Sequence, residues 1–314
     1  AKANRLKPNS GVSDVIDLAK RIDPDDFFDR AKLYGGPEYR VLDIMWDPDH
    51  FELRTSKVYD CKEQEDADVK RVAEGLDIGS FYQEVTGKRR EPRGLISVVG
   101  MSDRLDTFLM QSEKNQGALP DQMSPEEAIA RLRMVFSRGI IAAAEAVDAI
   151  TVSAGLDVGA SGYVGIANAD RNHRVPLVGV VCKNRTTWPG DERPDCDERH
   201  PLQPNHTHFV MLPGHDERAA MDMRFKLAQH YTDGGTKPAI AFVVNGGKKA
   251  LYEVLQCVRM GWPIIVIKGT GGVADRIRDA MEEPAKYITD AALTEVIQDG
   301  MIEFIELSEV DGFL

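Results

Sequence analysis

The chain has 314 residues, of which 42% are hydrophobic and 29% are charged, and its formal net charge is −12 at pH 7. A chain of this length and composition can bury a sizeable core without disulfides or metals. The acidic balance argues against a nucleic-acid partner, because binding a phosphate backbone needs clustered Lys and Arg.

The cysteines and the hydropathy pattern bear on the compartment. Cys61, Cys182, Cys196 and Cys257 form no CxxC pair, which indicates a reduced protein. No apolar run approaches the ~20 residues of a membrane span. We therefore expect a cytoplasmic protein, or the cytosolic part of a longer membrane-associated one.

The first 92 residues are polar and hold few clear periodic runs. Residues 10–22 and 66–76 are expected to form short amphipathic helices, and HFELRTSKVYD (50–60) to contain a strand. GKRREPRG (87–94) is predicted to be a solvated joint, since Pro92 stops a helix. We expect residues 1–92 to form a mixed, partly helical extension that packs on a core domain at 93–314.

From Gly94 onward, apolar strands alternate with amphipathic helices. LISVVGM (95–101) predicts a strand, and residues 102–122 a polar loop. Ser124, Pro125 and Glu127 form a capping box with proline at the first helical position. The helix that follows is expected to bury one face, which carries Ile129, Leu132, Val135, Phe136, Ile140 and Val147.

The same alternation continues to the end of the chain. Helices are expected around 220–227, around 251–258 and from Gly272. Strands are expected at 148–155, 175–182, 208–212, 239–244, 263–269 and 301–306. Near-continuous apolar strands separated by helices are typical of a parallel sheet covered on both faces. The prediction is an α/β, Rossmann-like fold with a mostly parallel sheet and helices on both faces.

Ligands of such sheets bind beyond the carboxyl ends of the strands. Glycine-rich loops follow four of the predicted strands, and they are VGMS (99–102), SAGLDVGASG (153–162), NGGKK (245–249) and KGTGGVAD (268–275). Glycine lets a backbone approach a ligand closely, and a helix N-terminus offers free N–H groups. We therefore predict a phosphate or nucleotide site at this edge.

Other catalytic and metal motifs are weak. No GxxxxGK[ST] or GxSxG occurs, and no GxGxxG follows the first strand, which argues against a P-loop NTPase and an ordinary dinucleotide-dependent dehydrogenase. Cys196, His200, His206 and His208 are spaced too irregularly to predict a zinc site, and a role in a pocket wall is preferred. Glu253 lies about two turns into the helix that NGGKK opens, where it is either a surface residue or a catalytic one.

Four stretches together resemble a known family: SAGLDVGASGYVGIA, LQPNHTHFVML, AIAFVVNGGKKALYEVLQCV and PIIVIKGTGGVADRI. They are similar to the SLOG superfamily, and within it to the LSDAT branch found at the cytosolic N-terminus of TRPM channels and in bacterial relatives. The likeness spans about residues 94–306. It implies a Rossmann-like domain that senses a nucleotide- or NAD-derived messenger, such as ADP-ribose or cyclic ADP-ribose, and controls an attached or associated effector or membrane module.

The resemblance also implies a set of ligand-binding positions. Lys248 would supply charge to phosphates, Tyr163 would stack on a base, and Asn205 and His206 would order the pocket wall. The strand-end candidates are Gly100, Met101, Ser102, Ser153, Ala154, Gly155, Asp157, Gly159, Asn245, Gly246, Gly247, Lys248, Gly269, Thr270, Gly271, Gly272 and Asp275. We expect a small nucleotide-derived ligand, no required cofactor and a homo-oligomer.

Two departures from the channel motifs affect the ligand. VGM stands where the channels have TGG, which places Met101 at a usual glycine. GTGG stands where they have GSGR, so the arginine of that motif is missing. These differences argue against ADP-ribose itself and are compatible with another nucleotide messenger.

An enzymatic alternative comes from the LOG-type phosphoribohydrolases of the same superfamily. Their PGGxGTxxE motif falls on Asn245 to Glu253, where both glycines and the glutamate match, and Asn245, Lys249 and Ala250 replace the Pro, Gly and Thr. If the protein is an enzyme, Glu253 would serve the cleavage of a nucleotide N-glycosidic bond. A third reading, single-stranded DNA binding as in the DprA branch, conflicts with the acidic charge.

Overall fold

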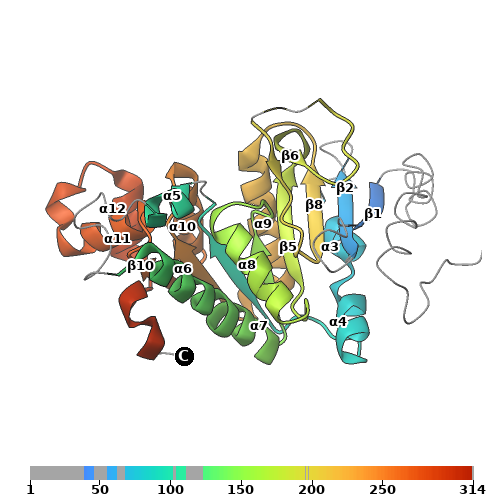
Figure 1. The fold of residues 1–314 in the computed structure, drawn as a ribbon, viewed down its shortest axis with the longest axis horizontal. Helices are drawn as coiled ribbons and strands as arrows, with labels where there is room; N and C mark the ends of the chain where they lie inside the picture. Colours follow the sequence, from blue (N-terminus) through green and yellow to red (C-terminus); the bar gives the residue numbers. More distant parts are fainter. Residues whose placement is uncertain are drawn as a thin grey trace, which may run out of the picture.

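The computed structural model describes residues 39–45, 55–61, 68–101, 104–110, 123–194, 196 and 198–312. The helix expected at 10–22, the candidate Ser102 and the loop expected beyond residue 110 lie outside these residues. Within the described ranges, one sheet of nine strands runs through the molecule in the order β1-β2-β8-β5-β4-β3-β9-β10-β11 (Figure 1). The strands are β1 (Tyr39–Met45), β2 (Thr55–Cys61), β3 (Gly94–Val99), β4 (Ala149–Ser153), β5 (Leu177–Cys182), β8 (His208–Leu212), β9 (Ala239–Val244), β10 (Ile264–Lys268) and β11 (Ile302–Glu306).

The strand pairing confirms the predicted α/β architecture. β1 pairs with β2 in antiparallel register, and every other neighbouring pair is parallel. From the central β3, the chain builds β4, β5 and β8 outward on one side and then returns to place β9, β10 and β11 on the other. The direction of growth therefore reverses between β3 and β9, and this is the topological switch point where such sheets bind ligands.

Helices cover both faces of the sheet, as expected. One face carries α3 (Val69–Leu76), α9 (Glu217–Tyr231), α10 (Lys248–Arg259), α11 (Gly272–Glu282) and α12 (Ala291–Asp299). The other carries α5 (Arg104–Met110), α6 (Pro125–Met134), a π-helical segment (Val135–Ile141), α7 (Ala142–Ala146) and α8 (Gly159–Asp170). A further helix, α4 (Ile78–Thr86), precedes β3.

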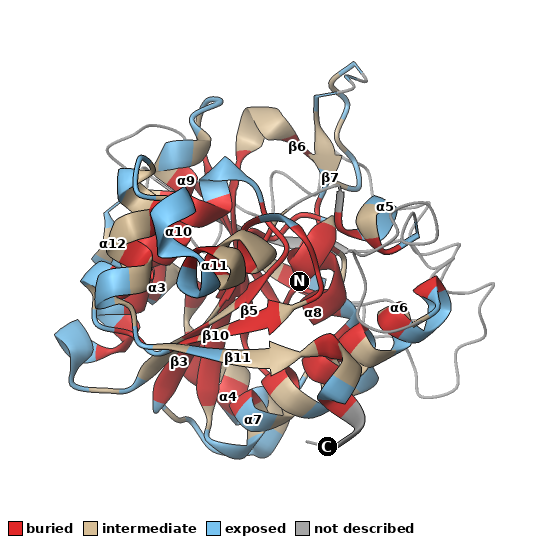
Figure 2. Ribbon diagram, turned by 90° about the vertical axis from the view of Figure 1, so that its left-hand side faces the viewer, coloured by how far each residue is buried: buried red, intermediate tan, exposed pale blue. Residues whose placement is uncertain are grey.

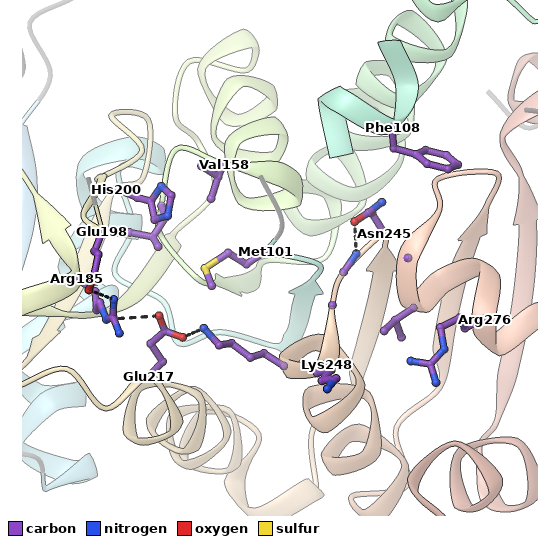
Figure 3. A pocket seen from close by; sticks show the side chains of 16 residues that line it. Met101, Phe108, Val158, Arg185, Glu198, His200, Glu217, Asn245, Lys248 and Arg276 are labelled. Carbon is purple, nitrogen blue, oxygen red and sulfur yellow. Dashed lines mark hydrogen bonds and ion pairs between the residues drawn. The ribbon is translucent and has the colours of Figure 1, made fainter. Parts of the chain in front are cut away.

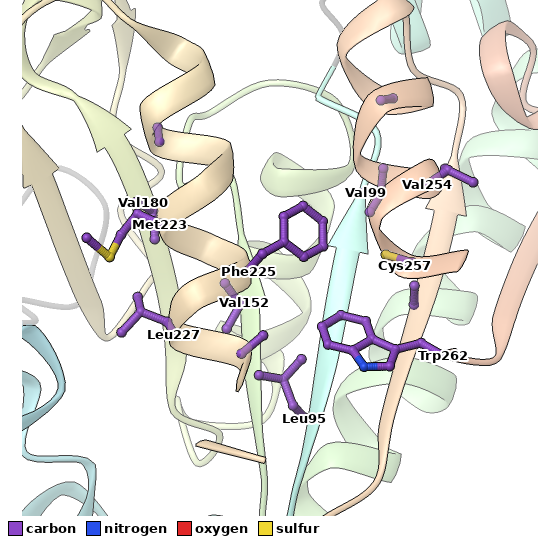
Figure 4. Close-up of a cluster of buried hydrophobic side chains, with 14 of the residues drawn as sticks. Leu95, Val99, Val152, Val180, Met223, Phe225, Leu227, Val254, Cys257 and Trp262 are labelled. Carbon is purple, nitrogen blue, oxygen red and sulfur yellow. The ribbon is translucent and has the colours of Figure 1, made fainter. Parts of the chain in front are cut away.

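Each strand shares its side chains between two cores, because successive residues of a strand point to opposite faces. In β3, Leu95 and Val99 join the core under α9 and α10, and Ile96 and Val98 join the core under α6 and α8. Figure 4 shows the first core, where Phe225 and Trp262 approach with ring centroids 6.0 Å apart. Figure 2 shows the central strands of the sheet buried between the two helical layers, whereas the edge strand β11 is only partly buried.

Local signals set several element boundaries. Ser124 Oγ accepts a hydrogen bond from the Glu127 amide at 3.1 Å, which confirms the predicted cap of α6. Val147, expected on the buried face, is 52% exposed because the helix has ended at Ala146. The expectation of a continuous loop from 102 was also wrong, since α5 occupies Arg104–Met110 and fully buries Leu105 and Leu109.

The N-terminal region supplies more of the sheet than the sequence suggested. The strand expected in 50–60 is β2, which pairs with β8, and β1 adds an unanticipated edge strand. The helix expected at 66–76 is α3, capped by Asp68, which accepts from two backbone amides. No helix in the described ranges is long and apolar enough to cross a membrane.

Candidate functional site

A cleft of about 790 Å³ opens at the carboxyl edge of the sheet, beside the switch point (Figure 3). Its lining comes from loops that follow β3, β4, β9 and β10, and from residues between β5 and the first turn of α9. Its volume lies within the usual range of small-molecule sites. The described residues that line it are Met101, Phe108, Leu156, Val158, Arg185, Glu198, His200, Glu217, Asn245, Gly246, Gly247, Lys248, Lys249, Gly272, Val273 and Arg276.

The loop between β9 and α10 is held in a fixed shape by Asn245. This residue has φ +53°, and its Oδ1 accepts from the Gly246 amide at 2.6 Å. Its own amide donates to Thr270 Oγ1 at 2.9 Å, and its Nδ2 donates to the Thr270 carbonyl at 2.6 Å. The loop after β9 is thereby fastened to the loop after β10, and both aim at the cleft.

The N-terminus of α10 points into the cleft without a cap. Gly247 is the N-cap residue, and no described side chain accepts a hydrogen bond from the first turn. The first amides of a helix have no partner within the helix, and its dipole makes that end positive. Lys248 follows at once, is exposed and has no ion pair within the described residues. This end of α10 is suited to an anion.

The N-terminus of α11 is already satisfied by the protein. Val273 N donates to Gly246 O at 2.8 Å, and Ala274 N donates to Asn245 O at 3.2 Å. The Asp275 carboxylate accepts from the amides of Gly269 and Gly271, each at 2.8 Å. Burial raises the pKa of the Asp275 carboxyl, and these two hydrogen bonds oppose that shift.

The candidates in that loop therefore differ in position. Gly269, Thr270, Gly271 and Asp275 make contacts within the protein, whereas Gly272 lines the cleft.

Close backbone approach explains glycine at the switch point. Gly100 has φ +133°, and a Cβ there would lie 1.8 Å from the Val244 carbonyl oxygen. Gly272 has φ +62°, and a Cβ there would lie 2.4 Å from the Gly246 carbonyl oxygen. These positions bring the ends of β3, β9 and α11 together, which a larger residue would prevent.

The side chains that line the cleft carry a net positive charge, whereas the chain as a whole is acidic. Among the described lining residues, the cations are Arg185, Lys248, Lys249 and Arg276, and the anions are Glu198 and Glu217. Arg185 pairs with Glu198 at 2.7 Å and lies 3.9 Å from Glu217, which also binds Lys249. Arg276 pairs with Asp290 at 2.8 Å. A local excess of cations in a chain of net charge −12 favours an anionic ligand.

Three candidates at the end of β4, Ser153, Ala154 and Gly155, are buried and do not line the cleft. Ser153 Oγ is 2.7 Å from His206 Nε2 and 3.1 Å from Ser161 Oγ, and all three residues are buried. Gly155 packs against Gly179, and a Cβ added to Gly155 would lie 2.7 Å from the Gly179 Cα. Of this loop's candidates, Ala154 lines a second, smaller pocket.

Tyr163 and Asn205 make contacts away from the cleft lining. Tyr163 OH donates to Asp106 at 2.7 Å, and its ring stacks on Phe136 with centroids 5.8 Å apart. Burial, followed by this hydrogen bond, raises the pKa of the Tyr163 hydroxyl. Asn205 Oδ1 lies 3.2 Å from His173 Nε2.

Two more candidates begin or precede α8. Asp157 is exposed, and its backbone amide donates to the Pro201 carbonyl at 2.9 Å. Gly159 is buried with φ +54° at the first position of the helix. No group of three or more His, Cys, Asp or Glu side chains within the described residues is placed to hold a metal.

Glu253 is buried and paired with an arginine. Glu253 is 6% exposed and Arg224 of α9 is 8% exposed. Arg224 Nε donates to Glu253 Oε1 at 3.0 Å, Nη2 donates to the same oxygen, and Nη1 donates to the Val180 carbonyl at 3.2 Å. Arg224 is a partner that no sequence motif predicted. The available signal was its helical position, because Arg224 is four residues after Ala220 and therefore on the buried face of α9.

The pair borders an inner pocket of about 30 Å³, which adjoins the cleft and also contains Ala154. Such a volume holds roughly one water molecule.

Comparisons with known proteins agree with this architecture. Residues 120–312 match the family described as SLOG in TRPM, prokaryote. The chain is 24% identical over 196 residues to transient receptor potential cation channel subfamily M member 5 of Homo sapiens, covering 51% of this chain and 17% of the channel. It is 27% identical over 186 residues to member 4 of Rattus norvegicus, covering 48% and 15%, and 25% identical over 191 residues to member 2 of Mus musculus, covering 51% and 13%. The match thus spans less than a fifth of each of these channels.

Proposed function

The chain belongs to the family of SLOG domains in TRPM, prokaryote, and from this premise we propose that its cleft binds an anionic nucleotide- or NAD-derived messenger. The observation that carries the proposal is the N-terminus of α10, which lines a cleft of about 790 Å³ together with Lys248, and for which the described residues provide neither a side-chain cap nor an ion pair to Lys248. Backbone amides and a positive helix end bind phosphate without a metal. No cofactor is required for this mode of binding.

The cleft divides into a polar and an apolar part, and the ligand chemistry follows from that division. The phosphates lie against the amides of Gly247 and Lys248, with Arg276 close to the same end. Phe108 and Val158 supply apolar surface on another part of the lining. An ADP-ribose-like or cyclic ADP-ribose-like molecule combines these features, since it carries phosphates together with sugar and base.

We propose that ligand binding serves as a signal and is not followed by turnover. The ligand must then bind two arrangements of the protein with different affinity. We propose that the arrangements are states of a homo-oligomer, or of an attached or associated effector, in the cytoplasm. The three relatives compared above are cation channels, and the matched region makes up less than a fifth of each of them.

Thermal denaturation tests the binding proposal. ADP-ribose, cyclic ADP-ribose isomers and other nucleotides are added to the purified chain at about 100 times the dissociation constant, where binding adds about 2.7 kcal/mol to the stability. For a chain of this size, the melting temperature should rise by roughly 5 °C. Absence of a shift across the whole panel would overturn the proposal.

A charge reversal locates the site. Lys248→Glu should abolish the shift, because it places a carboxylate at the N-terminus of α10. The matched control is Lys226→Glu, since Lys226 is exposed on α9 and does not line the cleft. Equal loss in both variants would mean that net charge, and not this site, governs binding.

A second function, cleavage of a nucleotide N-glycosidic bond, is favoured by one observation. Glu253, at the position of the LOG-type glutamate, has the buried arginine partner Arg224, and a carboxylate near a sugar can stabilise an oxocarbenium-like transition state. Incubation with nucleoside monophosphates and NAD-derived compounds, followed by chromatography, tests it. Release of free base by the wild type, and its loss in Glu253→Gln, would establish the enzyme; recovery of intact ligand would support the sensor.

A further inference from the structure

The residues that line both the cleft and the inner pocket of Glu253 and Arg224 lie between the two cavities, and we refer to them as the wall. Among the described residues, five line both cavities, and they are Met101, Leu156, Arg185, Glu217 and Lys249. The inner pocket holds roughly one water molecule, because its volume is about 30 Å³. A ribose ring cannot enter a space of that size unless the wall moves.

The wall has an apolar half and an ionic half. Met101 is partly buried and packs against the apolar cluster that includes Leu156. The Glu217 carboxylate binds Lys249 and lies 3.9 Å from Arg185. Figure 3 shows Met101 and the Arg185–Glu217 pair exposed to the same cleft.

We propose that Met101, together with the ion-paired Glu217, closes the inner pocket to the ligand of the cleft. A nucleotide held at the N-terminus of α10 is then kept from the Glu253–Arg224 pair, and Met101 is a residue that determines specificity for binding over cleavage. The identity of the ligand rests on the proposed function, whereas the wall itself does not.

The geometry explains why one side chain can have this effect. Met101 directly follows Gly100, whose contact with the Val244 carbonyl fixes the end of β3 against β9. The Met101 backbone therefore lies next to β9, so truncation of its side chain, and not a shift of its backbone, is the change expected to join the two cavities. Glycine at 101 removes that side chain and leaves the ion pairs of Glu217 as the remaining part of the wall.

Cys182 provides a reporter that needs no ligand. It lines the inner pocket, is 4% exposed, and its thiol donates to the Asp216 carbonyl at 3.0 Å. Cys61 and Cys257 are fully buried outside both cavities, and Cys196 is exposed. Labelling of each thiol by methyl methanethiosulfonate is followed by mass spectrometry of its peptide, at pH 8.5, on the full chain.

Three proteins are compared: the wild type, Met101→Gly, and Met101→Leu as the matched control that keeps the wall filled. Met101→Gly should label Cys182 at least ~10-fold faster than the other two, because the reagent no longer waits for a local opening. The labelling of Cys61 and Cys257 should not change. Equal Cys182 rates in Met101→Gly and wild type would overturn the proposal, and so would a parallel rise at Cys61 and Cys257, which would show general loosening.

A ligand arm separates this proposal from the proposed function. ADP-ribose should slow the labelling of Cys182 in Met101→Gly, since a nucleotide bound in the cleft then covers the opening through which the reagent reaches the thiol. If Cys182 is labelled faster in Met101→Gly but no nucleotide shifts the melting temperature of the wild type, the proposed role of Met101 stands and the proposed messenger binding is refuted. If a nucleotide shifts the melting temperature of the wild type but the labelling rate of Cys182 is unchanged in Met101→Gly, messenger binding is supported and the proposed role of Met101 is refuted.

Discussion

Glu253→Gln is the substitution that best tests how the buried pair contributes to this fold. It keeps the shape of the side chain and removes its charge, while Arg224 stays charged and buried. In the intact pair, Glu253 Oε1 accepts two hydrogen bonds from Arg224, one of them at 3.0 Å. Counted without their backbone atoms, the side chains of Glu253 and Arg224 are 7% and 10% exposed, so solvent cannot replace the lost partner.

The size of the effect follows from the geometry. Two unit charges 3.0 Å apart attract by about 5.5 kcal/mol at an effective dielectric constant of about 20. Burial of the two ions costs several kcal/mol for each, so the intact pair adds little net stability. Removal of one charge leaves the other buried without compensation, and we expect Glu253→Gln to lower the free energy of unfolding by about 3–5 kcal/mol.

Urea denaturation of single and double variants checks this expectation. Arg224→Met alone should destabilise by a similar amount, whereas Arg224→Met combined with Glu253→Leu should lie within about 1 kcal/mol of the wild type. A loss below about 1 kcal/mol in Glu253→Gln, or additive losses in the double variant, would refute the reasoning. Because the expected loss is large, activity of any Glu253 variant has to be measured where the protein is shown to be folded.

Two further predictions concern the switch point and the segment beside the cleft. Gly100→Ala should destabilise the protein by at least ~3 kcal/mol in thermal melts, since its Cβ would lie 1.8 Å from the Val244 carbonyl oxygen at φ +133°. Gly139→Ala is the control, because a Cβ there meets nothing within 4 Å, and it should be neutral or slightly stabilising. Equal losses of stability in the two variants would contradict the explanation by close contact. Burial tends to raise the pKa of Asp191, yet hydrogen bonds and charge from Arg193 lower it overall below its usual 3.8, so its contribution to stability is present above pH 3.8 and is lost as the pH falls through the lower folded value. Asp191→Asn should therefore flatten the fall in melting temperature below that pH, and an unchanged slope would rule out this residue as a cause.

The sequence by itself determined the class of fold, because its signals are local. The alternation of apolar strands and amphipathic helices predicted the parallel sheet with helices on both faces, and Ser124 marked the start of α6. Glycine after the strands indicated where the backbone turns closely, as Gly100 and Gly272 do. Short elements such as α5 were not predicted, because seven residues hold too few repeats to show a helical period.

Only the tertiary structure decided which loops meet. Strand order depends on packing between distant segments, and it placed the reversal of the sheet between β3 and β9. The cleft there brings together the candidates Met101, Gly272 and those in 245–248, whereas Asp275 satisfies backbone amides of its own loop. The pairing of Arg224 with Glu253 likewise joins residues 29 positions apart on different helices. No local pattern encodes such a contact, because it exists only once both helices have packed on the same face of the sheet.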